Sequence, residues 1–184
     1  MADPDVRLRV LDEETLPALL ACAVADADPA EVMPVPDDGA PPGWTPARRR
    51  AFLDFHRSRA LVTTGPPVET TYLVVVDGRV AGAARLRAEE QGTALETGVW
   101  IGRSDRGRGI GGRVAELLLA EAARSGARRL DASTTVRNVA ARRLLRRAGA
   151  ELREEADGEV RATVPLPPAP TARQPGPRRP AGGA

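Results

Sequence analysis

The sequence predicts a single α/β domain built on a mixed sheet, and three observations support this fold class. The chain has 184 residues, which suits one domain with a hydrophobic core. Alternating and helical hydrophobic patterns follow one another in the order β-α-α-β-β-β-α-β-α-β-β. Asp-Gly pairs at 77–78 and 157–158 have the turn chemistry of hairpins, so much of the sheet should be antiparallel.

The first half of the chain should supply two helices and four strands. "VRLRVL" (6–11) alternates as a strand does, and a helix is expected over 15–25. Residues 26–43 are too rich in Pro, Asp and Gly for regular structure. Thr45 and Pro46 read as the N-cap and first residue of a helix that reaches about Val62. A hairpin over 70–76 and 79–88 follows, and then a third strand over 94–101.

The second half begins with a glycine-rich loop and ends in a tail. The helix after the loop should end at Ser125-Gly126, before a strand over 128–134. Asn138 is expected to cap a helix that stops at Gly149, and residues 150–166 should form a closing hairpin. We expect residues 1–164 to form the domain and the Pro- and Arg-rich residues 165–184 to be disordered.

Composition excludes several classes of function. All 27 basic residues are arginine, against 25 acidic ones, and three of the arginines lie in the acid-free tail. Nucleic acid binding is therefore weakly supported, and we expect none. The chain shows no secretory signal and no apolar run of roughly 18 residues, so a cytoplasmic protein without membrane contact is expected. The single cysteine, Cys22, excludes an internal disulfide, and no metal-ligating pattern is visible.

The loop "RGRGIGG" (106–112) predicts an anion site. It stands between a strand and a helix, where unpaired backbone N–H groups meet the positive end of the helix dipole. Glycines let the backbone approach an anion closely. We expect the N–H groups of this loop to bind the anion, with further charge from arginine side chains; the loop residues are Arg106, Gly107, Arg108, Gly109, Ile110, Gly111 and Gly112, and Arg113 follows them.

Two familiar phosphate motifs fit poorly. Gly107, Gly109 and Gly112 match G-x-G-x-x-G, the dinucleotide fingerprint, but five residues separate Gly107 from the strand that ends at Ile101. A hairpin precedes the loop, and too little chain follows it for a dinucleotide-binding sheet. A Walker-type loop is excluded because the chain has no lysine.

The loop also fits R-x-x-G-x-G, and with a second segment it resembles the GNAT superfamily of acyl-CoA N-acyltransferases. That segment, "NVAARRLLRRAGAEL" (138–152), looks like the family's N-x-x-A-x-x-L-Y-x-x-x-G-F. "ETGVWIG" (96–102) is similar to the branch of ribosomal-protein N-terminal and small-molecule or drug acetyltransferases. The resemblance implies a mixed, mostly antiparallel sheet flanked by helices, with splayed central strands. It also implies acetyl-CoA as co-substrate.

The resemblance assigns roles to individual residues. The loop would hold the pyrophosphate of coenzyme A, main-chain groups of Val99 and Ile101 would pair with the pantetheine arm, and Asn138 would lie beside it. The N–H of Val99 would stabilise the oxyanion. Glu96 is the candidate general base, or else a cleft residue that attracts the amine.

One departure concerns the general acid. Leu145 stands where many family members have the tyrosine that protonates the departing thiolate, and leucine has no proton to donate. A thiol has a pKa of about 8.5, so water can serve as the donor. Candidate protein donors are Ser133, Thr134 and Thr135.

The expected function is N-acetylation of a primary amine, on a small molecule or a peptide N-terminus, by direct attack within a ternary complex. The resemblance implies that the segment 26–38 belongs to the wall of the acceptor site. Its acidic residues would either draw cationic acceptors or form a solvated acidic loop: Asp26, Asp28, Glu31, Asp37 and Asp38. Trp44 should anchor the proline-rich loop, and His56 should have a surface or packing role. The alternatives are a non-catalytic acyl-CoA-binding or regulatory module and, more remotely, an NAD(H)-dependent oxidoreductase; monomer and homodimer both stay open.

Overall fold

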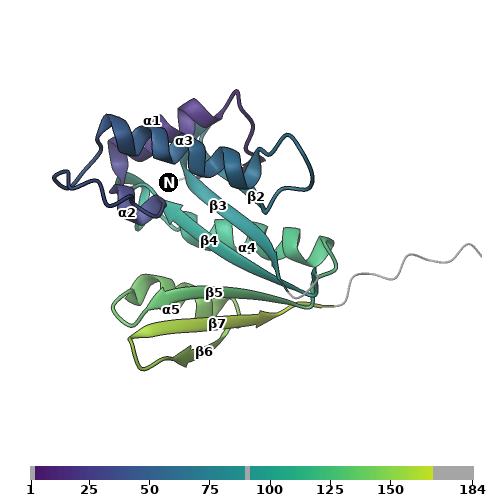
Figure 1. Cartoon of the computed structure of the whole chain (residues 1–184). Coiled ribbons are helices and arrows are strands. Elements are labelled where there is room, and N and C mark those ends of the chain that lie inside the picture. Colours follow the sequence, from purple (N-terminus) through teal and green to yellow (C-terminus); the bar gives the residue numbers. More distant parts are fainter. Residues whose placement is uncertain (1–2, 90–91, 168–184) are drawn as a thin grey trace, which may run out of the picture.

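A computed structural model describes residues 3–89 and 92–167 as one seven-stranded sheet with helices on both faces (Figure 1). The strand order is β1-β2-β3-β4-β5-β7-β6. The strands are β1 (Val6–Val10), β2 (Glu69–Val76), β3 (Arg79–Glu89), β4 (Ala94–Ile101), β5 (Arg129–Thr135), β6 (Glu151–Glu154) and β7 (Glu159–Pro165). The helices are α1 (Leu16–Asp26), α2 (Pro29–Val32), α3 (Pro46–Ala60), α4 (Ile110–Arg124) and α5 (Val139–Arg147).

Local sequence chemistry sets most of these boundaries. Asp77 and Gly78 have φ values of 49° and 83°, as a two-residue hairpin between β2 and β3 requires. Thr45 caps α3, because its side chain accepts a hydrogen bond from the N–H of Arg48, and Pro46 starts the helix. Asn138 caps α5 in the same way, through the N–H of Ala141. The predicted mixed, mostly antiparallel sheet is confirmed.

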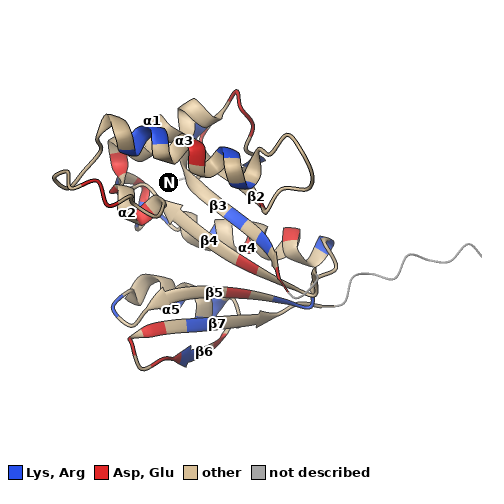
Figure 2. Cartoon of the chain, in the orientation of Figure 1, with Lys and Arg blue, Asp and Glu red and all other residues tan. Residues whose placement is uncertain are grey.

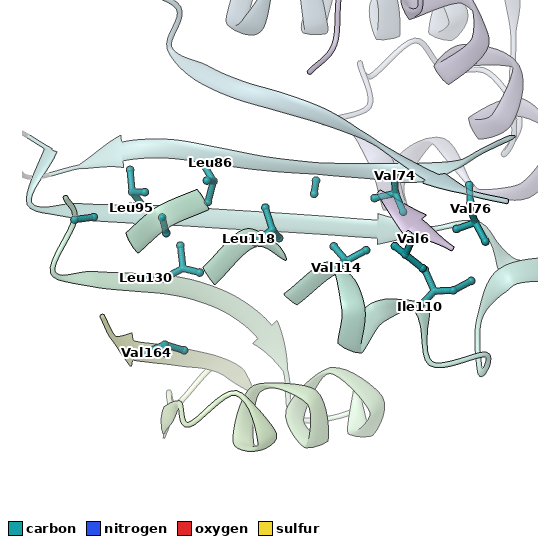
Figure 3. Packing of buried hydrophobic residues seen from close by; sticks show 14 residues of the cluster. Val6, Val74, Val76, Leu86, Leu95, Ile110, Val114, Leu118, Leu130 and Val164 are labelled. Carbon is teal, nitrogen blue, oxygen red and sulfur yellow. The ribbon is translucent and has the colours of Figure 1, made fainter. Parts of the chain in front are cut away.

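Each face of the sheet has its own core. On one face α4 packs its stripe of Ile110, Val114 and Leu118 against apolar residues of the strands (Figure 3). On the other face α1 and α3 cover the N-terminal half of the sheet around the fully buried Phe52. Figure 1 shows that α1, α2 and α3 lie over β2–β4 and leave the corresponding face of β5 and β7 open.

The centre of the sheet splays apart. Strands β4 and β5 run parallel and pair only from Ala94↔Arg129 to Thr97↔Ala132. Beyond that point β4 continues along β3 to Ile101, whereas β5 continues along β7 to Thr135. The two halves of the sheet therefore diverge, as Figure 1 shows, and the predicted splay is confirmed.

Three details differ from the sequence prediction. Residues 26–43 contain the short helix α2, started by Pro29 behind an Asp28–Glu31 capping box. A 3-10 turn, Arg103–Asp105, follows β4. The sheet also extends past 164, because Pro165 pairs with Arg129 and the N–H of Leu166 donates to the carbonyl of Arg128. The rest of the predicted tail, 168–184, lies outside the described residues. Within the described ranges, no helix is long and apolar enough to span a membrane.

Candidate active site

The glycine loop presents unpaired amides at the head of α4. Gly107 and Gly109 have φ values of 77° and 80°, a left-handed conformation that glycine adopts without strain. In the described part of the chain, the N–H groups of residues 107–111 make no hydrogen bond, and the first turn of α4 contains no acid. Free amides at a helix N-terminus are the donors that an anion site needs, and the anion site stays a prediction for this loop.

Gly111 and Gly112 are glycines for a different reason. Neither has positive φ, and a Cβ added to either would meet only a Leu144 methyl group, at 3.9 Å. Folding therefore does not require glycine at these two positions. Both line a groove of about 600 Å³ between α4 and α5, so the absent side chains leave room for a ligand.

Two arginines that the sequence reasoning overlooked line the same groove. Arg143 and Arg147 are exposed on α5, and within the described ranges neither has a carboxylate partner. Their i, i+4 spacing places both on one face of the helix. This i, i+4 repeat of arginine is the sequence signal for a basic helix face.

The side chains of the loop arginines, and of Arg113 after the loop, are bonded to other groups of the protein. Arg106 donates to the carbonyl of Ile101 at 2.9 Å and contacts Glu31 at 3.4 Å. Arg108 bonds Asp105 at 2.6 Å, and Arg113 bonds Glu116. Of the three, only Arg108 keeps a free backbone N–H, because the N–H groups of Arg106 and Arg113 donate to the carbonyls of Arg103 and Gly109. All three side chains are engaged with protein partners. Free positive charge at the groove thus comes from α5.

Asp105 holds the loop through hydrogen bonds to two arginines. It is 1% exposed and accepts hydrogen bonds from Arg79 at 2.5 Å and Arg108 at 2.6 Å. The Arg79 hydrogen bond is the main reason why the pKa of this carboxyl lies below its usual range. The ionised Asp105 therefore ties the start of the loop to β3.

Val99 lies where β4 and β5 diverge, beyond the last residue of β4 that pairs with β5. The N–H of Gly102 donates to Ala81 on β3, and the carbonyl of Trp100 also faces β3, at Gly82. Because main-chain groups alternate between the two edges of a strand, those of Val99 and Ile101 face the gap toward β5. The carbonyl of Ile101 is taken by Arg106, whereas Val99 is 44% exposed.

A cavity of about 180 Å³ fills the splay on the α4 side. Val99, Asn138 and Leu145 line it, together with Ser133 and Thr134; Thr135 is not part of its lining. The structure thus brings together Val99, Asn138 and two of the three candidate proton donors. The chain's one tyrosine, Tyr72, lies on β2 and packs in the core.

A profile of the acetyltransferase (GNAT) family matches residues 30–150. The chain belongs to this family. No curated protein matches the sequence. Many solved structures share the fold, including the following three. The GNAT domain of S. lividans PAT is 19% identical, covering 88% of this chain and 90% of that one, with a TM-score of 0.64. RimL, a ribosomal-protein α-N-acetyltransferase in complex with coenzyme A, is 21% identical, covering 88% and 94%, with a TM-score of 0.65. A GNAT acetyltransferase from Streptococcus pneumoniae is 20% identical, covering 89% and 100%, with a TM-score of 0.59.

In this GNAT acetyltransferase, Glu96 belongs to a chain of ion pairs on the face opposite α4. It accepts from Arg85 at 2.9 Å and 3.4 Å and pairs with Arg87. A carboxylate has about four lone-pair sites, so about one is left for a ligand. Figure 2 shows charged residues on β3, β4, β5 and β7, and they line a groove of about 640 Å³ that includes Glu96.

A second cavity lies on the α3 side of the splay, with a volume of about 260 Å³. It shares Gly98, Val99 and Ser133 with the cavity on the α4 side. Its further lining includes His56 and Glu69, whose side chain is fully buried and held by Arg59 and Arg85. The two cavities therefore meet at the exposed main chain of β4.

The acidic segment is not a free negative wall. Asp26 accepts from the N–H and hydroxyl of Ser104, Asp28 pairs with Arg103, and Asp38 pairs with Arg48 at 2.7 Å. With Glu31, which contacts Arg103 and Arg106, four of the five acids serve as internal ties. Trp44 does anchor the proline-rich loop, since its indole N–H donates to Ala27 at 2.8 Å.

Proposed function

We propose that this acetyltransferase transfers an acetyl group from acetyl-CoA to a primary amine of a small molecule or of a peptide N-terminus. One observation carries the proposal: the free main chain of Val99 separates a cavity continuous with the anion site from a cavity on the opposite face. A thioester on one side and an amine on the other would meet at this residue.

The donor side suits coenzyme A. The free amides of residues 107–111 would receive the pyrophosphate, and Arg143 and Arg147 would add charge to its phosphates. The main chain of Val99 offers a sheet edge to the pantetheine arm, and Asn138 lines its path. The carbonyl of Ile101 can join only if Arg106 releases it.

The chemistry needs a neutral amine and a stabilised oxyanion. The amine nitrogen forms a bond to the thioester carbonyl carbon, and the carbon–sulfur bond then breaks. We assign the hydrogen bond to the developing oxyanion to the N–H of Val99. Glu96 remains our candidate base, acting through its remaining lone pair or through water.

The transfer is direct, without a covalent enzyme intermediate. Burial raises the pKa of the Cys22 thiol to about 11, so the only cysteine stays protonated. The departing thiolate takes its proton from water or from Ser133 or Thr134, because Leu145 has none to give.

A calorimetric titration with acetyl-CoA tests the donor site. We expect saturable binding by the wild type and none by Gly109→Glu, whose side chain would enter the anion site. Thiol release with a panel of amines then tests transfer, and Glu96→Gln should slow it. Absence of wild-type binding would overturn the proposal.

Leu145 also supports a second candidate, a non-catalytic acyl-CoA-binding or regulatory module. Its position beside the α4-side cavity leaves that cavity without a tyrosine hydroxyl. This candidate predicts tight acetyl-CoA binding and no thiol release with any amine. If transfer does occur, the panel also distinguishes the two kinds of acceptor. The rate with a peptide would depend on the residues next to its N-terminus, whereas the rate with a small amine would need no such residues.

A further inference from the structure

Two residues that line the α3-side cavity have buried polar atoms without a hydrogen-bond partner. They are His56, through both ring nitrogens, and Trp100, through its indole N–H. The other unpaired buried side-chain atoms in the described ranges are the Nε atoms of Arg48 and Arg142, whose remaining nitrogens are bonded. Buried polar groups are nearly always paired in native proteins, so this pair of side chains needs an explanation.

Packing fixes His56 beside the cavity. It is 4% exposed, and its ring lies 4.5 Å from that of Phe52 and 5.3 Å from that of Phe55. Burial lowers the pKa of this imidazole to about 4, so it is neutral near pH 7. A neutral imidazole offers one N–H donor and one acceptor nitrogen, and Trp100 adds a second donor.

The charges around the cavity favour a particular ligand. The two acids of the lining are neutralised, since Glu31 pairs with Arg103 and Arg106, and Glu69 pairs with Arg59 and Arg85. Arg85 is in turn shared between Glu69 and Glu96. A polar but uncharged group suits this balance, whereas a carboxylate would find Arg85, the arginine of the lining, already paired. The volume of about 260 Å³ has room for about nine groups of the size of water, at ~30 Å³ each.

On the basis of the function proposed above, we infer that the α3-side cavity is the acceptor site and selects a compact primary amine with an uncharged oxygen nearby. His56 and Trp100 hydrogen-bond this hydroxyl or amide carbonyl oxygen and so determine specificity. An aminoalcohol and the first residue of a peptide both have this chemistry. A plain alkylamine does not, and it would leave both side chains unpaired.

Nuclear magnetic resonance tests the site without relying on activity. The chain has one histidine and two tryptophans, so the His56 signals are unique and Trp100→Phe assigns its indole N–H. We expect glycinamide and ethanolamine to shift both signals, and their isosteres isobutylamine and n-propylamine to shift neither. Equal shifts from the isosteres, or no shift from any amine, would overturn the inference.

Steady-state rates test specificity with a matched control. For the wild type we expect kcat/KM to favour glycinamide over isobutylamine by about tenfold to hundredfold. His56→Phe and Trp100→Phe should bring this ratio near one, while Trp44→Phe, whose indole is bonded elsewhere, should keep it. A ratio that survives in both cavity variants would refute the assignment. If acetyl-CoA fails to bind, the proposed function falls, and the amine titration still decides the cavity.

Discussion

Replacing Gly111 by alanine should separate cofactor binding from folding. The new methyl group would project into the groove between α4 and α5 and meet only Leu144, at an ordinary contact distance of 3.9 Å. No positive φ is disturbed, and alanine is the better helix former. The substitution therefore harms the protein only if a ligand has to approach the Gly111 backbone.

The two expected effects have opposite signs. Replacing glycine by alanine in an unstrained helical position stabilises a protein by about 0.4–1 kcal/mol. A methyl group that separates a phosphate from one amide removes a charge-assisted hydrogen bond, worth about 1.5–3 kcal/mol. At 1.4 kcal/mol per factor of ten, the Kd for coenzyme A should rise by roughly tenfold to hundredfold.

Urea unfolding and calorimetric titration with coenzyme A measure the two quantities on the same protein. Ala120→Gly, at an exposed position of the same helix, is the converse control. It should cost about 0.5–1 kcal/mol of stability and leave binding unchanged. Wild-type affinity in Gly111→Ala would refute the placement of the pyrophosphate in this groove.

Three further predictions use the same assays. Arg143→Gln and Arg147→Gln should each weaken coenzyme A binding about threefold to tenfold at low salt, and by less at high salt. Arg146→Gln, outside the groove, should not weaken it, and titrations at two salt concentrations check both expectations. Asp105→Asn should lower the free energy of unfolding by about 1–3 kcal/mol at pH 7. Because the pKa of the Asp105 carboxyl is lowered in the folded state, the difference between this variant and the wild type in urea unfolding should shrink as the pH falls toward 3. Between about pH 6.5 and 4, the unfolded chain binds a proton at His56 and the folded chain does not. The free energy of unfolding should therefore fall by up to about 3 kcal/mol as the pH is lowered through that window. Unfolding measured against pH should show this slope in the wild type and not in His56→Phe.

Local signals in the sequence were enough for most of the fold. Hairpin turns at the Asp-Gly pairs, the Thr45-Pro46 helix start and the Asn138 cap all follow from short-range chemistry. The splay of β4 and β5 came from the family resemblance, because periodicity within a strand does not reveal where its pairing with another strand ends. The Asp28 capping box was readable in the sequence but was overlooked within a proline-rich segment.

The site was predictable where it depends on backbone and not where it depends on side-chain pairing. Glycine content and strand order put the loop beside the α4–α5 groove, and Val99 and Asn138 beside the α4-side cavity; their roles stay predictions. Ion pairs that depend on how strands and loops come together could not be foreseen: Arg85 and Arg87 on β3 hold Glu96 on β4, and Arg79 on β3 holds Asp105. The role inferred for His56 likewise depends on tertiary burial, which a single histidine on a helical pattern does not reveal.

Helix α5 gives the last prediction, because it is the least anchored part of the donor side. None of its residues is buried, yet its apolar stripe of Ala141, Leu144 and Leu145 lines the α4-side cavity. Coenzyme A in that cavity would cover the stripe and bridge α4 to α5. Hydrogen exchange of the α5 amides should therefore slow when coenzyme A binds, and by more than that of β1, on the far edge of the sheet. Ligand at a hundred times its Kd should also add about 2.7 kcal/mol to global stability. Equal slowing in α5 and β1 would mean that the ligand stabilises the protein only globally, and the bridging role of α5 would be wrong.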